Sequence, residues 1–185
     1  MLNLPNCLTL LRLFAIPVFL VFLLDLRYRE ALTVFVAAGI TDALDGAIAR
    51  LTHSKTTLGA YLDPAADKLL LLSAFIALGF VAELPRWLVI IVLSRDVIVV
   101  LGYFLLFAMT QRAIEIRPSI IGKLATFFQL SAVSLVLLSL VRGRPLLPAL
   151  EECVFYLAGL MTAGAGLQYV YRGLRWVQYQ EEAKG

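Results

Sequence analysis

Four aspartates lie within otherwise apolar sequence and have the spacing of a metal site. Asp42 and Asp45 are three residues apart, and Asp63 and Asp67 are four apart. On a helix, either spacing puts both carboxylates on one face. Carboxylates inside a membrane are costly unless they have partners, and hard cations such as Mg²⁺ or Mn²⁺ take oxygen ligands while leaving positions for water and phosphate. The four acids therefore predict a divalent-metal site.

Small and basic residues lie beside these acids. Gly46, Ala49 and Gly59 remove side-chain bulk next to the aspartates. Arg50 supplies a planar, permanently charged donor that suits phosphate oxygens. Acids for a metal, room for a nucleotide and an arginine for a phosphate together indicate a metal-dependent phosphoryl-transfer site.

Two other interpretations of the acids are open. Gly and Ala often pack helices in membranes, and Arg50 could pair with one aspartate in a purely structural arrangement. Intramembrane carboxylates also line ion pathways, so a small cation or proton transporter is the non-enzyme alternative. An ion pathway has no need for Asp-Gly followed by Ala-Arg, and this pattern favours the enzyme.

The elements that must position the acids are predicted to be membrane helices. Hydrophobic residues make up 61% of the 185 residues, against roughly 45–50% in globular proteins, and the mean hydropathy is +0.89. Runs long enough to cross a bilayer as helices cover six stretches of the sequence, roughly 8–25, 31–51, 63–83, 87–109, 119–141 and 150–172. The short linkers predict an all-α integral membrane bundle of six transmembrane helices, with residues 1–185 as a single domain. The polar tail from Gln178 is expected to fray.

The charges indicate a membrane location and exclude a nucleic-acid partner. The net charge is only +3, and the basic residues are scattered between apolar runs rather than clustered. Their distribution over the linkers favours cytoplasmic termini, so we expect the acids to face the cytoplasm. The expected location is the inner (plasma) membrane of a bacterium. Cys7 and Cys153 are expected to be buried free thiols. Gly159, Gly164 and Gly166 are expected to serve close helix packing.

The segment from Asp42 to Asp67 resembles the complete signature of the CDP-alcohol phosphatidyltransferases. All four aspartates, both glycines, the alanine and the arginine stand at the family spacing. Further stretches resemble the branch of this family that makes phosphatidylglycerophosphate and cardiolipin, namely residues 4–12, 63–68, 94–96 and 122–129. The similarity therefore extends along nearly the whole chain.

The resemblance implies transfer of a phosphatidyl group from CDP-diacylglycerol to an alcohol, with release of CMP, at a two-metal site. It assigns the metals to Asp42, Asp45, Asp63 and Asp67. It also makes Asp67 the general base that takes the proton of the acceptor hydroxyl. The cytidine diphosphate would be bound by Asp42, Gly46, Ala49, Arg50 and Gly59. Homodimers are common in the family, and the lipid tails of the substrate would stay among the membrane lipids.

The acceptor alcohol is predicted from three basic residues near the ends of spans. Arg95, Arg117 and Lys123 are expected to bind an anionic acceptor, although contacts with lipid headgroups or helix packing also explain them. Phosphatidylglycerophosphate synthases are expected to carry Lys and Glu where this chain has Ala125 and Asp96. Those two departures resemble eukaryotic-type cardiolipin synthases. The predicted acceptor is glycerol 3-phosphate, the commoner acceptor in this branch, and phosphatidylglycerol is the alternative.

Overall fold

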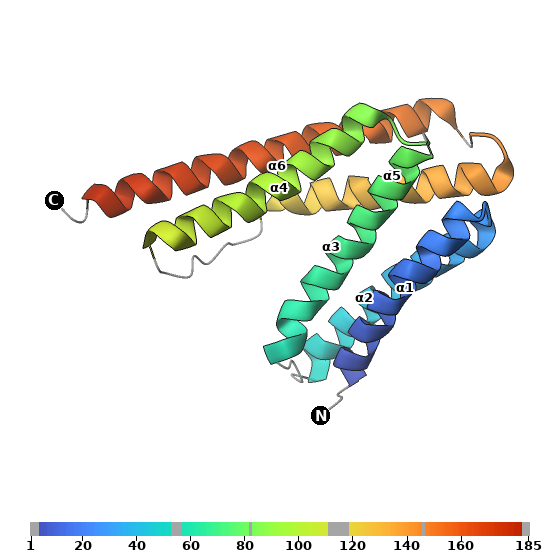
Figure 1. The fold of residues 1–185 in the computed structure, drawn as a ribbon, viewed down its shortest axis with the longest axis horizontal. Helices are drawn as coiled ribbons and strands as arrows, with labels where there is room; N and C mark the ends of the chain where they lie inside the picture. Colours follow the sequence, from blue (N-terminus) through green and yellow to red (C-terminus); the bar gives the residue numbers. More distant parts are fainter. Residues whose placement is uncertain (1–3, 53–56, 82, 111–118, 146, 183–185) are drawn as a thin grey trace. The chain divides into compact units, whose positions relative to one another are not determined.

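The computed structural model is helical throughout the part of the chain that it describes (Figure 1). The helices are α1 (Leu4–Leu24), α2 (Tyr28–Thr52), α3 (Thr57–Phe80), α4 (Arg86–Thr110), α5 (Ile120–Arg142) and α6 (Pro148–Glu182). The backbone is described for residues 4–52, 57–81, 83–110, 119–145 and 147–182, and side chains for residues 10–41, 66, 68–81, 83–106, 108, 119–145, 147–176 and 178. The predicted all-α fold class is confirmed.

The helix boundaries differ from the predicted spans mainly at the start of α3 and at the end of α6. α3 begins at Thr57 rather than near residue 63, and α6 continues to Glu182 rather than ending near residue 172. The prediction that the chain frays from Gln178 is therefore wrong for residues 178–182, which are helical. Hydropathy marks where apolar sequence stops, whereas Arg, Gln and Glu in the last part of α6 are good helix formers that extend the helix beyond it.

Within the part of the chain that the structure describes, three helices are long and apolar enough to cross a membrane. They span Arg86–Leu106, Ile120–Arg142 and Pro148–Trp176. Within the described residues, Leu10–Leu24 and Lys68–Phe80 are shorter apolar segments. Large apolar side chains such as Phe104 and Leu167 are exposed, as expected when lipid rather than water surrounds the helices. The chain is therefore a membrane protein, and the count of six spans stays a prediction.

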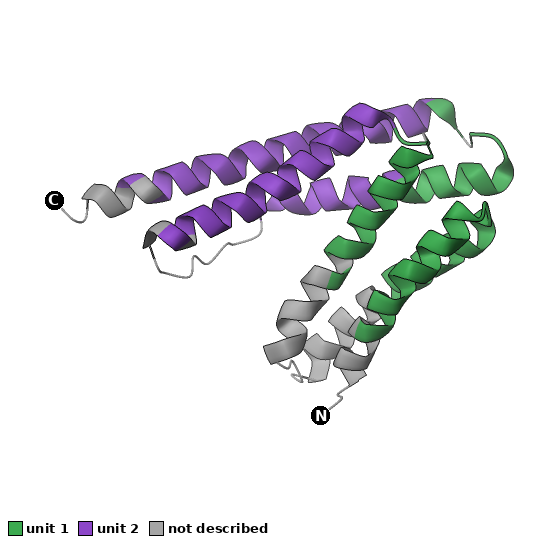
Figure 2. Ribbon diagram, viewed as in Figure 1, with its two compact units in different colours: residues 1–84, 133–148 green, residues 85–132, 149–185 purple. Residues whose placement is uncertain are grey.

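The helices divide between two compact units (Figure 2). Unit 1 contains residues 1–84 and 133–148, and unit 2 contains residues 85–132 and 149–185. α5 thus contributes its first half to unit 2 and its second half to unit 1. The single domain expected from the sequence stays a prediction.

In unit 1, α1 packs against both α2 and α3. The buried apolar core includes Phe19 and Leu23 of α1 and Phe75 and Leu78 of α3, all fully buried. The ring of Phe19 also meets that of Phe35 on α2, with the centroids 5.8 Å apart. This contact fixes how α1 and α2 align along their lengths.

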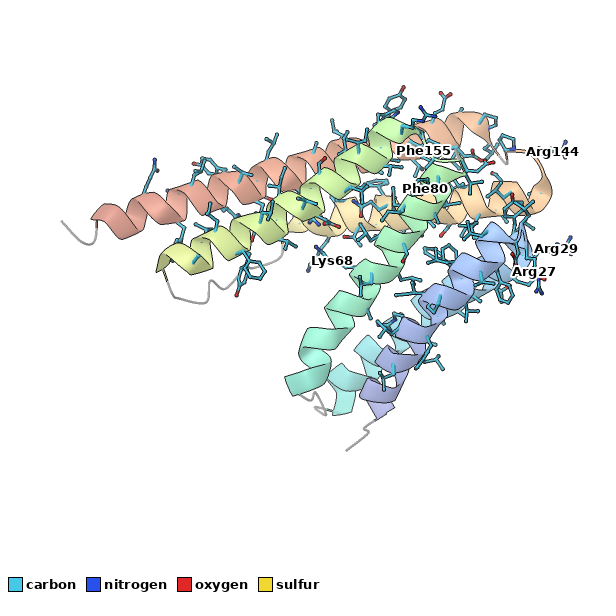
Figure 3. All side chains as sticks on the ribbon, in the orientation of Figure 1. Arg27, Arg29, Lys68, Phe80, Arg144 and Phe155 are labelled. Carbon is cyan, nitrogen blue, oxygen red and sulfur yellow. The ribbon has the colours of Figure 1, made fainter. Side chains whose placement is uncertain are left out.

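A tight turn joins α1 to α2. Leu26 has a φ of 61°, a left-handed conformation that reverses the chain. The Arg27 guanidinium donates to the carboxylate of Glu30, with Nη2 and Oε1 2.9 Å apart, and also lies 4.6 Å from the ring centroid of Phe22. Figure 3 shows Arg27 and Arg29 together at this turn. The turn makes α1 and α2 antiparallel neighbours.

In unit 2, α4 and α6 approach each other through glycines. Three glycines of α6 at intervals of seven residues face α4: Gly159 meets Trp87, Gly166 meets Arg95 and Gly173 meets Leu106. Seven residues make about two helical turns, so the three glycines lie along one side of α6. Their partners follow in the same chain order, so the two helices run parallel. The packing role predicted for Gly159 and Gly166 is confirmed.

α5 and α6 are joined by a buried polar contact. The amide Nε2 of Gln129 donates to Oγ1 of Thr162 at 2.8 Å, and these residues are 6% and 0% exposed. A Cβ added at Gly164 would lie 3.7 Å from Cγ2 of Ile121, so α6 also packs closely on α5 at that glycine. The hydrogen bond fixes the register of the two helices inside unit 2.

The expectation for the cysteines is wrong for one of them. Cys153, near the start of α6, is exposed. In a membrane protein an apolar environment lies outside the helices as well as between them, so apolar flanking sequence does not predict burial in the protein. Cys7 lies outside the described side chains.

Candidate functional site

The four aspartates lie on two consecutive helices of unit 1. Asp42 and Asp45 are in α2, and Asp63 and Asp67 are in α3. Their side chains lie outside the described residues. The helical backbone at these positions is what the spacing argument requires, and the assignment of the four residues as metal ligands stays a prediction. We refer to them below as the aspartate cluster.

The two aspartate pairs lie at matching heights along their helices. Asp42 is ten residues before the end of α2, and Asp67 is ten residues after the start of α3. Each is therefore about 15 Å along its helix axis from the connection between them. Asp45 and Asp63 are each about 10 Å from that connection by the same rise per residue. α2 and α3 run in opposite directions from the connection (Figure 1), so the two pairs come to one level of unit 1.

The predicted nucleotide-binding residues lie toward the α2–α3 connection. Gly46, Ala49 and Arg50 follow Asp45 on α2, and Gly59 is in the first turn of α3. Their side chains also lie outside the described residues. Their positions put small residues and a cation between the aspartate cluster and the end of the helical pair.

A divalent metal suits the donor chemistry of the aspartate cluster. All four members offer carboxylate oxygens, the ligands that Mg²⁺ and Mn²⁺ prefer over sulfur or imidazole. Two helices that each carry a pair of such groups would leave further coordination positions for water and for phosphate oxygens. The cluster would hold the metals, and the residues toward the connection would meet the nucleotide.

Unit 1 also has a buried cation that the sequence does not reveal. Arg12, on α1, is only 1% exposed. An apolar run interrupted by one arginine is compatible with a side chain that reaches toward a headgroup, so sequence alone does not reveal this burial. Its place in the interior becomes evident only once α1 is seen to pack against both helices that carry the aspartates.

In unit 2, Arg95 extends from α4 between α5 and α6. Its Nη1 lies 2.6 Å from Oδ1 of Asp96. A Cβ at Gly166 would lie 3.4 Å from Cγ of Arg95, and a Cβ at Gly122 would lie 3.9 Å from Nη2. Among the described residues, the buried Nε of Arg95 has no hydrogen-bond partner. Arg95 therefore combines a packing contact and an ion pair with a free donor.

The start of α5 lies next to this arginine. Oγ of Ser119 accepts a hydrogen bond from the backbone N–H of Gly122 at 3.0 Å, which caps the helix. Lys123 follows and is exposed. A helix N-terminus carries partial positive charge, so Lys123 and the N-terminal end of α5 form an electropositive region of unit 2 beside Arg95, whose charge Asp96 offsets. Arg117, the third predicted acceptor residue, lies outside the described residues.

Asp96 and Ala125, the two residues that bear on the choice of acceptor, have different surroundings. Asp96 is occupied by its ion pair with Arg95. Ala125 is 1% exposed, within the interior of unit 2. A lysine at this position would have to place its charge inside the unit, so alanine here removes one cation from the region near Lys123.

Comparison with known proteins identifies the family. Residues 2–164 match CDP-alcohol phosphatidyltransferase. The "Probable phosphatidylglycerophosphate synthase" of Mycobacterium tuberculosis is 40% identical over 94% of this chain and 82% of its own length. The "CDP-diacylglycerol--glycerol-3-phosphate 3-phosphatidyltransferase" of Bacillus subtilis is 31% identical over 91% of this chain and 94% of its own length.

A relative with a different name is also similar. The "Probable cardiolipin synthase (CMP-forming)" of Drosophila melanogaster is 34% identical over 91% of this chain and 56% of its own length. The family match includes both aspartate pairs and the whole of α1, α2 and α3. The chain is therefore a membrane enzyme that belongs to the CDP-alcohol phosphatidyltransferase family.

Proposed function

We propose that the protein transfers a phosphatidyl group from CDP-diacylglycerol to glycerol 3-phosphate and releases CMP, as a step of phospholipid biosynthesis. The observation that carries this proposal is the matched height of the two aspartate pairs on α2 and α3. The names of the mycobacterial and Bacillus relatives support the choice of acceptor.

The proposed reaction is a substitution at the phosphatidyl phosphorus. Asp42, Asp45, Asp63 and Asp67 would hold two Mg²⁺ or Mn²⁺ ions, which when bound supply Lewis-acid stabilisation of the developing phosphate charge. Asp67 would take the proton of the acceptor hydroxyl. The acceptor oxygen then forms a bond to phosphorus as the bond to the CMP oxygen breaks.

The residues around the aspartate cluster would bind the nucleotide. Arg50 would donate to the diphosphate, because a guanidinium can bond two phosphate oxygens at once. Gly46, Ala49 and Gly59 would leave room for the cytidine beside the helices, and Asp42 would contribute to this binding as well as to the metals. The diacyl chains would remain in the bilayer.

The electropositive region of unit 2 would bind the acceptor. Glycerol 3-phosphate is nearly dianionic, as the second pKa of a phosphate monoester is about 6. Arg95 offers a buried Nε without a partner among the described residues. Lys123 and Arg117 would add the remaining positive charge. An exposed lysine on the first turn of α5 suits a small soluble acceptor.

Phosphatidylglycerol is the second candidate acceptor, which would make the enzyme a cardiolipin synthase. The burial of Ala125 favours it, because that interior position then carries no cation. A phosphodiester bears a single negative charge and needs fewer cations than a phosphomonoester. The name of the Drosophila relative is consistent with this alternative.

We also propose an orientation and a location for the enzyme. Both termini would be cytoplasmic, with the aspartate cluster facing the cytoplasm from a bacterial inner membrane, since the basic residues are more numerous in the linkers on that side. The exposed apolar side chains of the helices would contact membrane lipids or a second copy in a homodimer.

The test measures CMP release by the purified protein in detergent with CDP-diacylglycerol and Mg²⁺ or Mn²⁺. One sample receives glycerol 3-phosphate and the other phosphatidylglycerol. We expect release with glycerol 3-phosphate, whereas release with phosphatidylglycerol alone would establish the cardiolipin synthase. Release with neither acceptor would overturn both assignments. Ion flux in proteoliposomes that depends on the aspartates but not on CDP-lipid would then favour the transporter.

A further inference from the structure

Among the described side chains of unit 1, Arg12 is a buried charge that the proposed reaction does not use. Its side chain is 1% exposed and is among the largest fully buried side chains of the described residues. A guanidinium stays charged under all physiological conditions. Opposite charge nearby stabilises a buried guanidinium, and acids of unit 1 at the height of Arg12 are in a position to supply it.

The acids at the helix ends of unit 1 are badly placed for this purpose. Asp25 is thirteen residues beyond Arg12, about 20 Å along the helix axis. Glu30 is bonded to Arg27 at the α1–α2 turn. Glu83 follows the C-terminal end of α3. The other acids of unit 1 are the four members of the aspartate cluster.

The alignment of α1 with α2 brings Arg12 to the height of that cluster. The rings of Phe19 and Phe35 are in contact, with centroids 5.8 Å apart. Arg12 is seven residues before Phe19, and Asp42 is seven residues after Phe35. Because the helices are antiparallel, both residues lie about 10 Å from the ring pair in the same direction. Asp67 is at the height of Asp42 on α3, which α1 also contacts.

We propose that Arg12 is a fixed counter-ion of the aspartate cluster. Its guanidinium offsets the repulsion among the carboxylates while no metal is bound, with Asp42 as its principal partner. When divalent ions neutralise the cluster, this contribution becomes small. Arg12 is therefore a positioning residue, which keeps the two aspartate pairs together before the metals enter. Its link to catalysis rests on the proposed function, whereas its effect on the metal-free protein does not.

The proposal predicts a stability defect that depends on metal. Thermal unfolding of the purified protein in detergent would be followed in EDTA and in Mn²⁺. Arg12→Gln should lower Tm by several degrees in EDTA, and Mn²⁺ should restore most of that loss. Arg12→Lys keeps the charge, so its Tm in EDTA should fall less than that of Arg12→Gln. Arg29→Gln is the matched control, because Arg29 is an exposed arginine at the α1–α2 turn, and its Tm should match that of the wild type in both conditions.

A loss of Tm in Arg12→Gln that is the same in EDTA and in Mn²⁺ would overturn the proposal, because it would mean that Arg12 only fills space. A double variant tests the pairing directly. Arg12→Gln with Asp42→Asn removes both charges, so its Tm in EDTA should exceed that of Arg12→Gln alone, and a Tm at or below the single variant would also contradict the proposal. If Arg12→Gln cannot be purified but the double variant can, this recovery supports the pairing in the same way as a higher Tm. If neither variant can be purified, the assignment of Asp42 as the partner is wrong.

These measurements separate the inference from the proposed function. None of them requires turnover, so an absence of CMP release would overturn the function and leave the counter-ion role standing. If the wild type releases CMP normally but Asp42→Asn does not restore the Tm of Arg12→Gln, the counter-ion role alone would be overturned.

Discussion

Gly159 on α6 lies directly against the indole of Trp87 on α4. A Cβ added at Gly159 would be 2.5 Å from Cζ3 of the ring and 3.2 Å from Cη2. The same indole stacks on Tyr156 of α6, with the ring centroids 5.4 Å apart. Trp87 is thus held between a glycine and an aromatic ring, and the backbone of α6 comes within contact of α4.

The first prediction concerns this contact. Gly159→Ala should destabilise the protein by about 1–3 kcal/mol, because the ring must move to admit the methyl group. Replacing glycine by alanine in a helix otherwise gains roughly 1 kcal/mol, and the strain at Gly159 removes that gain. Thermal unfolding in detergent measures it. Gly39→Ala is the control, because a Cβ there would meet nothing within 4 Å, so equal losses at the two positions would contradict the packing argument.

The second prediction concerns the hydrogen bond between Gln129 and Thr162. Gln129→Leu and Thr162→Val should show a coupling of about 0.6 kcal/mol and at most about 1.7, the range for such bonds in membrane proteins. A double-mutant cycle on unfolding free energies gives this value. Ser131→Ala serves as the control partner for Gln129→Leu, since its hydroxyl bonds within α5 to the carbonyl of Phe127. Coupling of the same size in both cycles would show that the α5–α6 bond is not the cause.

The third prediction concerns the general base. Asp67→Asn should lower the rate of CMP release by about 10²–10⁴-fold, because an amide cannot take the proton of the acceptor hydroxyl. EDTA should abolish release by the wild type, and Mg²⁺ or Mn²⁺ should restore it. Asp25→Asn, at the exposed α1–α2 turn, should turn over like the wild type. A wild-type rate in Asp67→Asn would rule out this role.

The fourth prediction concerns Arg95. Arg95→Met should raise the KM for glycerol 3-phosphate by about tenfold or more, since hydrogen bonds to charged groups contribute about 1.5–3 kcal/mol. The KM for CDP-diacylglycerol should change little. Arg142→Met removes an exposed arginine at the C-terminal end of α5 and should alter neither constant. If both KM values rise together in Arg95→Met, the arginine acts through helix packing.

The fifth prediction concerns pH and Glu30. A hydrogen bond with its own backbone, and then one from Arg27, hold the pKa of Glu30 below its ordinary value of 4.5. A lowered pKa in the folded state stabilises the protein above the unfolded pKa, and the stabilisation is lost as pH falls through the folded pKa. The Tm advantage of the wild type over Glu30→Gln should therefore be present at neutral pH and vanish under acid. The advantage is small because the carboxylate is exposed, and a difference unchanged between these pH values would refute the assignment.

The helical elements could be predicted because they depend on local sequence. Apolar runs and polar linkers indicated each helix, and the spacing of Asp42 with Asp45 depended only on helix periodicity. The end of α6 at Glu182 could not be predicted in the same way. A hydropathy pattern records where lipid contact ends, and helix propensity extends further along the chain.

Contacts between distant residues could not be predicted, since they depend on how two helices align. Gln129 and Thr162 are 33 residues apart, and no local pattern sets the register of α5 against α6. The burial of Arg12 likewise requires knowing that α1 lies against both α2 and α3. Arg95 and Asp96 are adjacent in the sequence, so their ion pair could be predicted. The packing of Arg95 against Gly166 could not.

The seven-residue interval of Gly159, Gly166 and Gly173 restricts how the sequence of α6 can change in length. One residue inserted after Gly159 would turn the rest of the helix by about 100° and move it by about 1.5 Å. Gly166 and Gly173 would then leave the side that faces α4, and bulkier neighbours would take their places. Substitutions can accumulate on the lipid side of α6, whereas an insertion within this segment is tolerated only when it comes as a whole heptad.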